Sequence, residues 1–490
     1  MRGVAWSGSV KWLTQVVAWV ATWTVARLLT PDDFGLVGLA AVYFGFLTLL
    51  SEAGLGMTVI ALRELDGHPL REMHTFAALL GVVGFLLSCI VATPIAAFYG
   101  EPALRAIVVV MSVNFIILAL RTVPQAVLQR DLSFKRVAAT DGVNALATAI
   151  TSVALAFAGY RYWSLVLGTL VGSVFATVLT LSWKPLAFRW PRFAELRGPL
   201  RTSREILGSS IAWYISQSAD FVVAGKLLGK GAAGTYTFSW NIAYSLVEKI
   251  TALVNGVTSS IFSAAKHDRS LLTRYITRIT GALAFVLLPA TTGVALIANE
   301  LILAVLGPQW RGAIVPLILL VLYAGVRSLT PILGQALVIT GDTKYAMRRN
   351  VVGAIVLPIA FIVGAKLGGL VGIALAWMLV HAPVVLVPMF RRVSRHLGIG
   401  VREYLPAIAP ALVSTAIMAV VVLGVAAAIP DRTPQLALLG IKIVVGAATY
   451  AAAVWLFFRE NVMSLVRALS QLRERGPARE TAAASPAITP

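Results

Sequence analysis

The chain has 490 residues, of which 58% are hydrophobic and 13% are charged. Soluble domains carry about 25% charged residues, so this composition excludes an ordinary soluble protein and favours one that lipid solvates. The single cysteine, Cys89, lies within an apolar run, which excludes a disulfide framework and a thiolate metal site.

Fourteen apolar segments follow one another along the chain. Most have the roughly 20 residues that a membrane span needs, and they are too long for strands. Many more segments follow the first, so we expect it to be a retained span and not a cleaved signal peptide. We therefore predict an all-α integral membrane protein with 14 transmembrane helices, near residues 6–27, 35–61, 73–98, 103–121, 138–159, 162–183, 206–226, 235–258, 278–299, 312–331, 351–366, 368–390, 404–429 and 434–458.

The turn between the first two segments has a strong local signal. Pro31, Asp32 and Asp33 are expected to end the first helix and start the second. Proline suits the first helical turn, and acidic side chains suit the positive end of the helix dipole.

The chain also repeats itself weakly. The stretch that begins at Arg27 returns 199 residues later at Lys226, so that Gly35 aligns with Gly234. Arg121 and Arg327 form a second match at an offset of 206 residues. Internal repeats of this kind are typical of transporters. They predict two pseudo-symmetric six-helix lobes, 1–183 and 206–390, joined by a basic cytoplasmic linker, 184–205, and followed by helices 13 and 14 in 391–458 and a largely disordered cytoplasmic tail, 459–490.

Positive charge is distributed unevenly between alternate connections. One side receives 29 Lys and Arg residues, whereas the other receives eight, namely Arg27, Arg105, Arg161, Lys226, Lys230, Arg311, Lys366 and Arg432. The positive-inside rule then places both termini in the cytoplasm, because the number of helices is even. The same rule explains the net charge of +20 through contact with anionic membrane lipids, without any nucleic acid.

Three short stretches carry a family resemblance: R-L-L-T-P-D-D-F-G-L at 27–36, S-E-A-G-L-G at 51–56 and L-Q-R-D-L-S-F-K-R at 128–136. The chain resembles the polysaccharide transporter family of Wzx-like O-antigen and exopolysaccharide flippases, over about residues 1 to 460. That family shares a superfamily with the MATE multidrug exporters and the lipid II flippase. The resemblance implies a MATE-like fold in a bacterial inner membrane. It also implies flipping of a lipid-linked oligosaccharide on an undecaprenyl pyrophosphate carrier, with a polysaccharide polymerase and glycosyltransferases as partners.

Ionisable residues inside the predicted spans are the candidate site, because charge in hydrocarbon is costly and is usually functional. For substrate binding we predict four cations, Lys11, Arg27, Lys249 and Arg327; for ion coupling or gating we predict three carboxylates, Glu52, Asp220 and Glu248. The alternatives are structural. Lys11 and Glu52 have similar estimated depths and could form an ion pair, the two arginines could extend to the membrane interface, and Asp220 and Glu248 could hold structural hydrogen bonds.

The sequence lacks the motifs of ATP hydrolysis and of a zinc protease. There is no G-x-x-x-x-G-K-[ST] and no H-E-x-x-H, so we expect no catalytic residues, no cofactor and no metal site. A transporter of the same fold that exports small organic molecules in exchange for ions is the main alternative, since Asp220 and Glu248 would suit cationic cargo. A membrane polymerase or ligase is the weakest interpretation, because the longest outer connection, 299–312, is too short for a catalytic domain.

The charge asymmetry predicts the topology. In a variant without Cys89, a single cysteine in the 299–312 connection should react with an impermeant thiol reagent on intact cells. A single cysteine in the 184–205 linker should stay unlabelled until the cells are broken. Labelling of the linker in intact cells would contradict this orientation.

Overall fold

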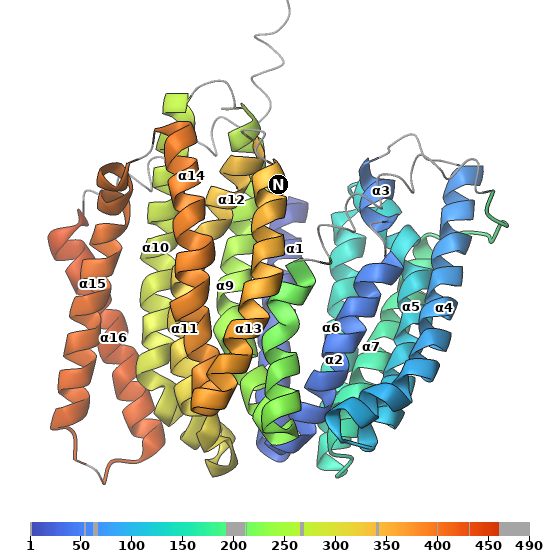
Figure 1. Cartoon of the computed structure of the whole chain (residues 1–490), viewed down its shortest axis with the longest axis horizontal. Coiled ribbons are helices and arrows are strands. Elements are labelled where there is room, and N and C mark those ends of the chain that lie inside the picture. The colour runs from blue at the N-terminus through green and yellow to red at the C-terminus, as the bar shows by residue number, and fades with distance from the viewer. Residues whose placement is uncertain are drawn as a thin grey trace, which may run out of the picture. The chain divides into compact units, whose positions relative to one another are not determined.

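The structure is a computed structural model and describes residues 2–52, 55–61, 67–192, 211, 213–264, 269–339, 343–398, 400–430 and 432–459. Within these ranges the secondary structure is helical and there is no strand. Figure 1 shows long helices that run side by side. Ten helical stretches among the described residues are long and apolar enough to cross a membrane. The predicted all-α membrane fold is therefore confirmed.

The helices follow the predicted spans in chain order. Their bounds are α1 (Arg2–Leu28), α2 (Pro31–Glu52), α3 (Leu55–Ala61), α4 (His68–Tyr99), α5 (Ala103–Arg130), α6 (Phe134–Phe157), α7 (Tyr162–Trp183), residues 213–228, α9 (Lys230–Ala264), α10 (Arg269–Glu300), η1 (Leu301–Leu306), η2 (Pro308–Ala313), α11 (Ile314–Arg327), α12 (Thr330–Ile339), α13 (Thr343–Ala376), η3 (Trp377–Leu386), α14 (Val387–Leu397), α15 (Val401–Ala428) and α16 (Gln435–Phe457).

Three predicted spans are divided in the structure. The segment 35–61 forms α2 and α3, the segment 312–331 contributes to η2, α11 and α12, and the segment 368–390 crosses from α13 through η3 into α14. Conversely, α13 is helical on both sides of a break at Gly368 and Gly369, where Gly369 has a φ of 58°. Only glycine adopts this conformation readily. The break therefore separates the predicted spans 351–366 and 368–390.

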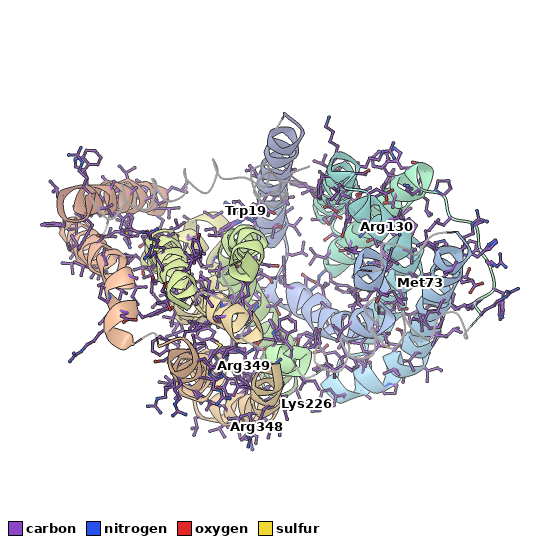
Figure 2. The ribbon with its side chains drawn as sticks, turned by 90° about the horizontal axis from the view of Figure 1, so that it is seen from above. Trp19, Met73, Arg130, Lys226, Arg348 and Arg349 are labelled. Atoms are coloured by element: carbon purple, nitrogen blue, oxygen red, sulfur yellow. The ribbon has the colours of Figure 1, made fainter. Side chains whose placement is uncertain are left out.

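Side-chain exposure fits a protein solvated by hydrocarbon. Ile90 of α4 is 72% exposed and Val420 of α15 is 70% exposed, although both are large and apolar. Figure 2 shows many such side chains that project outward from the helices. In water a surface of this kind would be unfavourable, so these faces match the acyl chains of a bilayer.

The contacts divide the chain into two compact units. The first contains Met1–Asn241, Ile302–Pro316 and Met347–Ala382, and the second contains Ile242–Leu301, Leu317–Ala346 and Pro383–Pro490. The predicted division into lobes 1–183 and 206–390, with the linker and tail, stays a prediction.

Small residues let the helices of the first unit approach closely. An added Cβ at Gly81 of α4 would clash with Ala119 and with the backbone of α5, and one at Gly168 of α7 would clash with Ser152 of α6. Helices in membranes use this close packing because hydrocarbon offers no hydrophobic drive between them.

In the second unit, a buried ion pair holds α16 against α10. Lys442 Nζ lies 2.8 Å from Glu300 Oε1, and the two side chains are 9% and 4% exposed. The ammonium also donates to the Leu296 carbonyl at 3.2 Å, and the Tyr450 hydroxyl donates to the Phe285 carbonyl at 2.7 Å. Loss of one partner of such a pair leaves a buried charge and costs about 3–5 kcal/mol. Lys442, to which sequence reasoning assigned no role, thus attaches the last helix to its unit.

Candidate functional site

The α1–α2 turn forms a self-contained cap at the predicted outer end of the first unit. Thr30 donates to Asp33 Oδ2 from its backbone nitrogen at 3.1 Å and from its hydroxyl at 2.7 Å. In return, the Asp33 backbone nitrogen donates to the Thr30 hydroxyl at 3.4 Å. This reciprocal arrangement satisfies donors at the start of α2, which begins at Pro31 as predicted.

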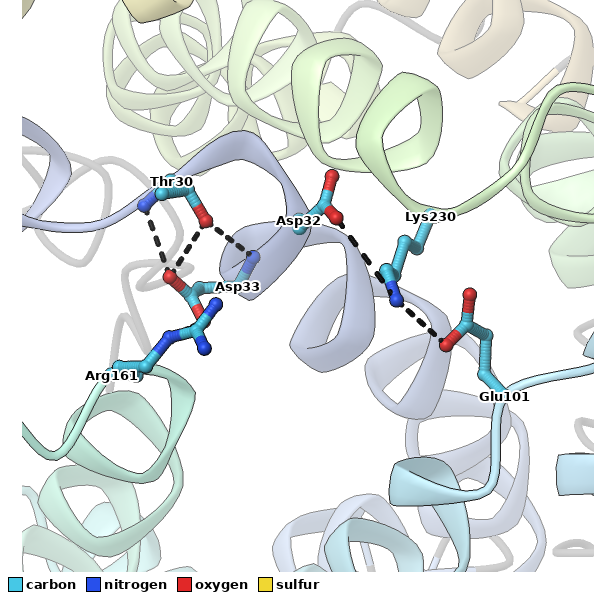
Figure 3. Close-up of polar contacts among 6 residues, drawn as sticks. All are labelled: Thr30, Asp32, Asp33, Glu101, Arg161 and Lys230. Carbon is cyan, nitrogen blue, oxygen red and sulfur yellow. Dashed lines mark hydrogen bonds and ion pairs between the residues drawn. The ribbon is translucent and has the colours of Figure 1, made fainter.

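Two cations, one just before α7 and one at the start of α9, reach the same turn (Figure 3). Arg161, which precedes α7, places Nε 3.2 Å from Asp33 Oδ1. Lys230, the first residue of α9, places Nζ 2.9 Å from Glu101 Oε2 and 4.0 Å from Asp32 Oδ2. The hydrogen bond to Glu101 raises the pKa of Lys230. A raised lysine pKa stabilises the fold below the usual value near 10.5, and this contribution is lost only as the pH rises through the higher, folded pKa. The Lys230 ammonium is therefore charged at every physiological pH.

Beneath the charges, the first turns of α2 and α9 meet backbone to backbone. An added Cβ at Gly35 would clash with the Lys230 carbonyl, and one at Gly234 would clash with the Pro31 carbonyl. These contacts are reciprocal under the predicted repeat, because Pro31 and Lys230, like Gly35 and Gly234, are 199 residues apart. One turn further, an added Cβ at Gly38 would lie 3.4 Å from the Cβ of Thr237, again 199 residues apart. The two helices thus cross about a local pseudo-twofold axis.

An aromatic cluster fills the space beside this crossing. Trp310 of η2 is fully buried, and its indole nitrogen donates to the Ala26 carbonyl at 2.8 Å. Its ring centroid lies 5.3 Å from that of Phe34 and 4.6 Å from that of Phe238. Arg27 donates from its guanidinium to the Val305 carbonyl at 3.2 Å. The end of α1 is therefore closed by the segment that precedes α11.

Asp220 lies in a second polar cluster of the same unit. It is fully buried, and its carboxylate accepts from the Tyr236 hydroxyl at 2.8 Å, the Trp377 indole at 3.0 Å and the Phe221 backbone at 2.9 Å. The Trp377 indole also lies 3.1 Å from the Tyr236 oxygen. In the described part of the chain, the groups that contact this carboxylate are a phenol, an indole and an amide. A buried carboxylate held by neutral donors is suited to exchange a proton or a small cation.

The remaining predicted residues are distributed over both units. Arg327 belongs to the second unit, half-buried, with its guanidinium carbon 5.0 Å from the Tyr244 ring centroid. Glu248 is exposed on α9 in the same unit. The side chains of Lys11, Glu52 and Lys249 lie outside the described part of the structure. The predicted substrate and coupling roles of all seven residues stay predictions.

Sequence reasoning missed most partners in these clusters. Glu101, Tyr236 and Trp377 lie in unremarkable local sequence, and no spacing links them to the residues that they contact. A usable signal existed only for Lys230, because the 199-residue repeat aligns it with Pro31, the first residue of α2.

The chain was compared with known proteins by fold and by sequence. The fold is similar to that of the lipid II flippase MurJ in its inward closed conformation, which superposes with a TM-score of 0.76, over 94% of this chain and all of that one, at 13% identity. A family model described as "Polysaccharide biosynthesis protein" matches residues 24–315. The chain belongs to this family.

Two curated relatives extend the similarity. The lipopolysaccharide biosynthesis protein WzxC of Escherichia coli K12 is 22% identical over 412 residues, which cover 83% of each chain. The succinoglycan biosynthesis transport protein ExoT of Rhizobium meliloti is 27% identical over 335 residues, which cover 67% of each chain. The family resemblance read from the three short stretches is thus confirmed.

The contact between Gly38 and Thr237 should close covalently. In a variant without Cys89, we expect Gly38→Cys with Thr237→Cys to form a disulfide in mild oxidant, because the Cβ separation is close to the roughly 3.5–4.5 Å of such bonds. The bond would join α2 to α9 at their crossing. If the crossing opens during transport, oxidation should abolish transport and a reductant should restore it.

Each single-cysteine variant serves as a matched control for oxidation. Transport at the full rate by the cross-linked protein would show that α2 and α9 stay together throughout the cycle.

Proposed function

We propose that this protein is a flippase that moves a lipid-linked oligosaccharide across the bacterial inner membrane for polysaccharide or lipopolysaccharide synthesis. The observation that carries the proposal is family membership together with the flippase fold over 94% of the chain. The names of WzxC and ExoT support a polysaccharide cargo, and we infer undecaprenyl pyrophosphate as its carrier.

Alternating access supplies a physical route for this cargo. A sugar–pyrophosphate head group must cross about 30 Å of hydrocarbon, whereas the lipid tail can stay in the bilayer. We infer that both termini are cytoplasmic, that the two lobes rock about the linker, and that the crossing of α2 and α9 is the outer gate. At this crossing the two helices are in contact, with Gly35 against Lys230 and Gly234 against Pro31.

Substrate capture is assigned to the predicted cations. Lys11 is expected to meet the pyrophosphate at the inner mouth, with Arg27, Lys249 and Arg327 along the route. Lys or Arg side chains are suited to this task because phosphate oxygens accept strong, charge-assisted hydrogen bonds. A polysaccharide polymerase and glycosyltransferases would act next to the flippase.

A reconstituted assay tests the function directly. Vesicles that contain the protein and an undecaprenyl-pyrophosphate-linked oligosaccharide should expose that sugar to an external impermeant glycosidase over time. Vesicles without the protein are the inactive control, and the oxidised Gly38→Cys, Thr237→Cys variant then reports whether the crossing must open. Transport of small organic cations without movement of the lipid-linked sugar would identify an exporter and overturn the proposal.

Asp220 is the better candidate for ion coupling, because it is buried among neutral donors while Glu248 is exposed. Asp220→Asn keeps the acceptor for Tyr236 and Trp377 but cannot titrate. We expect normal abundance and a loss of transport of about a hundredfold, the low end of the effect of a positioned general acid–base group. Transport should also lose its dependence on pH and membrane potential.

Glu248→Gln is the companion variant for this measurement. Normal transport by both variants over a range of pH and potential would exclude proton coupling through these two carboxylates.

A further inference from the structure

An apolar pocket lies among α2, α4, residues 213–228 and α13, all within the first unit. Its volume is about 670 Å³, within the roughly 300–1,000 Å³ of pockets that hold small molecules. Side chains that include Leu39, Phe46, Ile95, Phe98, Val222 and Ile362 line it. Phe98 is 46% exposed and Ile362 is 40% exposed, so the walls also face the surrounding hydrocarbon.

Four side chains with a hydroxyl group line the pocket, Tyr43, Tyr99, Tyr214 and Ser218, and those of Tyr43 and Tyr214 donate to internal partners. Tyr43 donates to the Ser88 hydroxyl at 3.0 Å, and Tyr214 donates to the Val42 carbonyl at 2.7 Å. Their donors are therefore used inside the protein, and the surface that they present to the pocket is aromatic. Such a surface suits a hydrocarbon chain and does not suit a sugar, which would need many hydrogen bonds.

A cation contacts Phe98, one of the residues that line this pocket. Lys226 follows Val222 and Val223 by four and three residues on the same helix, so the three side chains share one face. Its ammonium donates to the Phe98 carbonyl at 2.5 Å and lies 4.8 Å from the Phe98 ring centroid. Figure 2 labels Lys226, which is exposed. An ammonium has three donors, so it can hold Phe98 and a phosphate oxygen together.

We propose that this pocket binds an anionic phospholipid, with one acyl chain among the apolar side chains and the phosphate at Lys226. The choice rests on charge, because the Lys226 ammonium matches the single negative charge of a phosphodiester. The bound lipid would bridge α2, α4, residues 213–228 and α13 directly below the crossing of α2 and α9. The proposal does not depend on the proposed substrate route.

Native mass spectrometry of the purified full chain provides the test. In mixed micelles with equal phosphatidylglycerol and phosphatidylcholine of matched chains, the wild type should retain phosphatidylglycerol preferentially. Lys226→Met should lower that retention about fivefold, since one basic contact with an anionic lipid is worth about that factor. Lys226→Arg should keep it. Val222→Trp, which fills the pocket, should lower it as well.

Two matched controls lie outside the pocket. Lys135→Met removes an exposed lysine of α6, a helix that contributes no side chain to the pocket, and Val83→Trp adds an indole at a residue of α4 that is 58% exposed. Both should retain the lipid as the wild type does.

Three results would overturn the proposal. These are unchanged retention in Lys226→Met, equal retention of phosphatidylcholine by the wild type, or retention of added undecaprenyl phosphate in place of phosphatidylglycerol, which would assign the pocket to the carrier lipid. If Val222→Trp fails to fold, the comparison of Lys226→Met with Lys226→Arg decides the question, because both change an exposed side chain.

Discussion

The backbone contact between the first turns of α2 and α9 is the constraint on which the rest of the first unit depends. Gly35 and Gly234 allow the helices to touch without side chains between them, and the contact repeats itself about a pseudo-twofold axis. Everything else at this end is built around it: Lys230 reaches Glu101 and Asp32, Arg161 reaches Asp33, and Trp310 fills the adjoining space. A contact that relies on missing side chains is tight but has few atoms to separate, which suits a gate.

Hydrocarbon imposes the second constraint. A polar group in the bilayer must find its partners inside the protein, because lipid supplies none. Asp220 is satisfied by Tyr236, Trp377 and a backbone amide, and Glu300 pairs with Lys442. These two ways of satisfying a buried carboxylate leave it with different net charge. The Glu300–Lys442 pair neutralises its own charge and attaches one helix to another, whereas the Asp220 carboxylate is held only by neutral donors in the described part of the chain.

The same helices therefore carry three separate properties at different places. The crossing of α2 and α9 closes the predicted outer end, the Asp220 cluster provides a buried acidic group, and the apolar pocket faces the bilayer. A flippase needs each of these: a gate to alternate access, a coupling group to drive it, and lateral surfaces that tolerate lipid while a polar head group passes. Family membership and the fold support the proposed function, and the gate and coupling roles of these features are part of that proposal.

The sequence by itself determined the fold class and most helix positions, because these depend on local patterns. Apolar length predicts spans, Pro31 and the acidic pair after it predict the start of α2, and the 199-residue repeat predicts which glycines correspond. The negative charge of Asp220 and its estimated depth within a predicted span also marked it as a candidate site residue. Its partners could not be found this way, since Trp377 is 157 residues distant and a span cannot reveal which face meets which neighbour. The pairing of Lys230 with Glu101, the opposition of Gly35 to Lys230 and the pocket at Lys226 exist only because particular helices pack together. Tertiary structure alone decided these contacts, because a hydrophobic pattern specifies that a helix is solvated by lipid or protein but not which of the two covers each face.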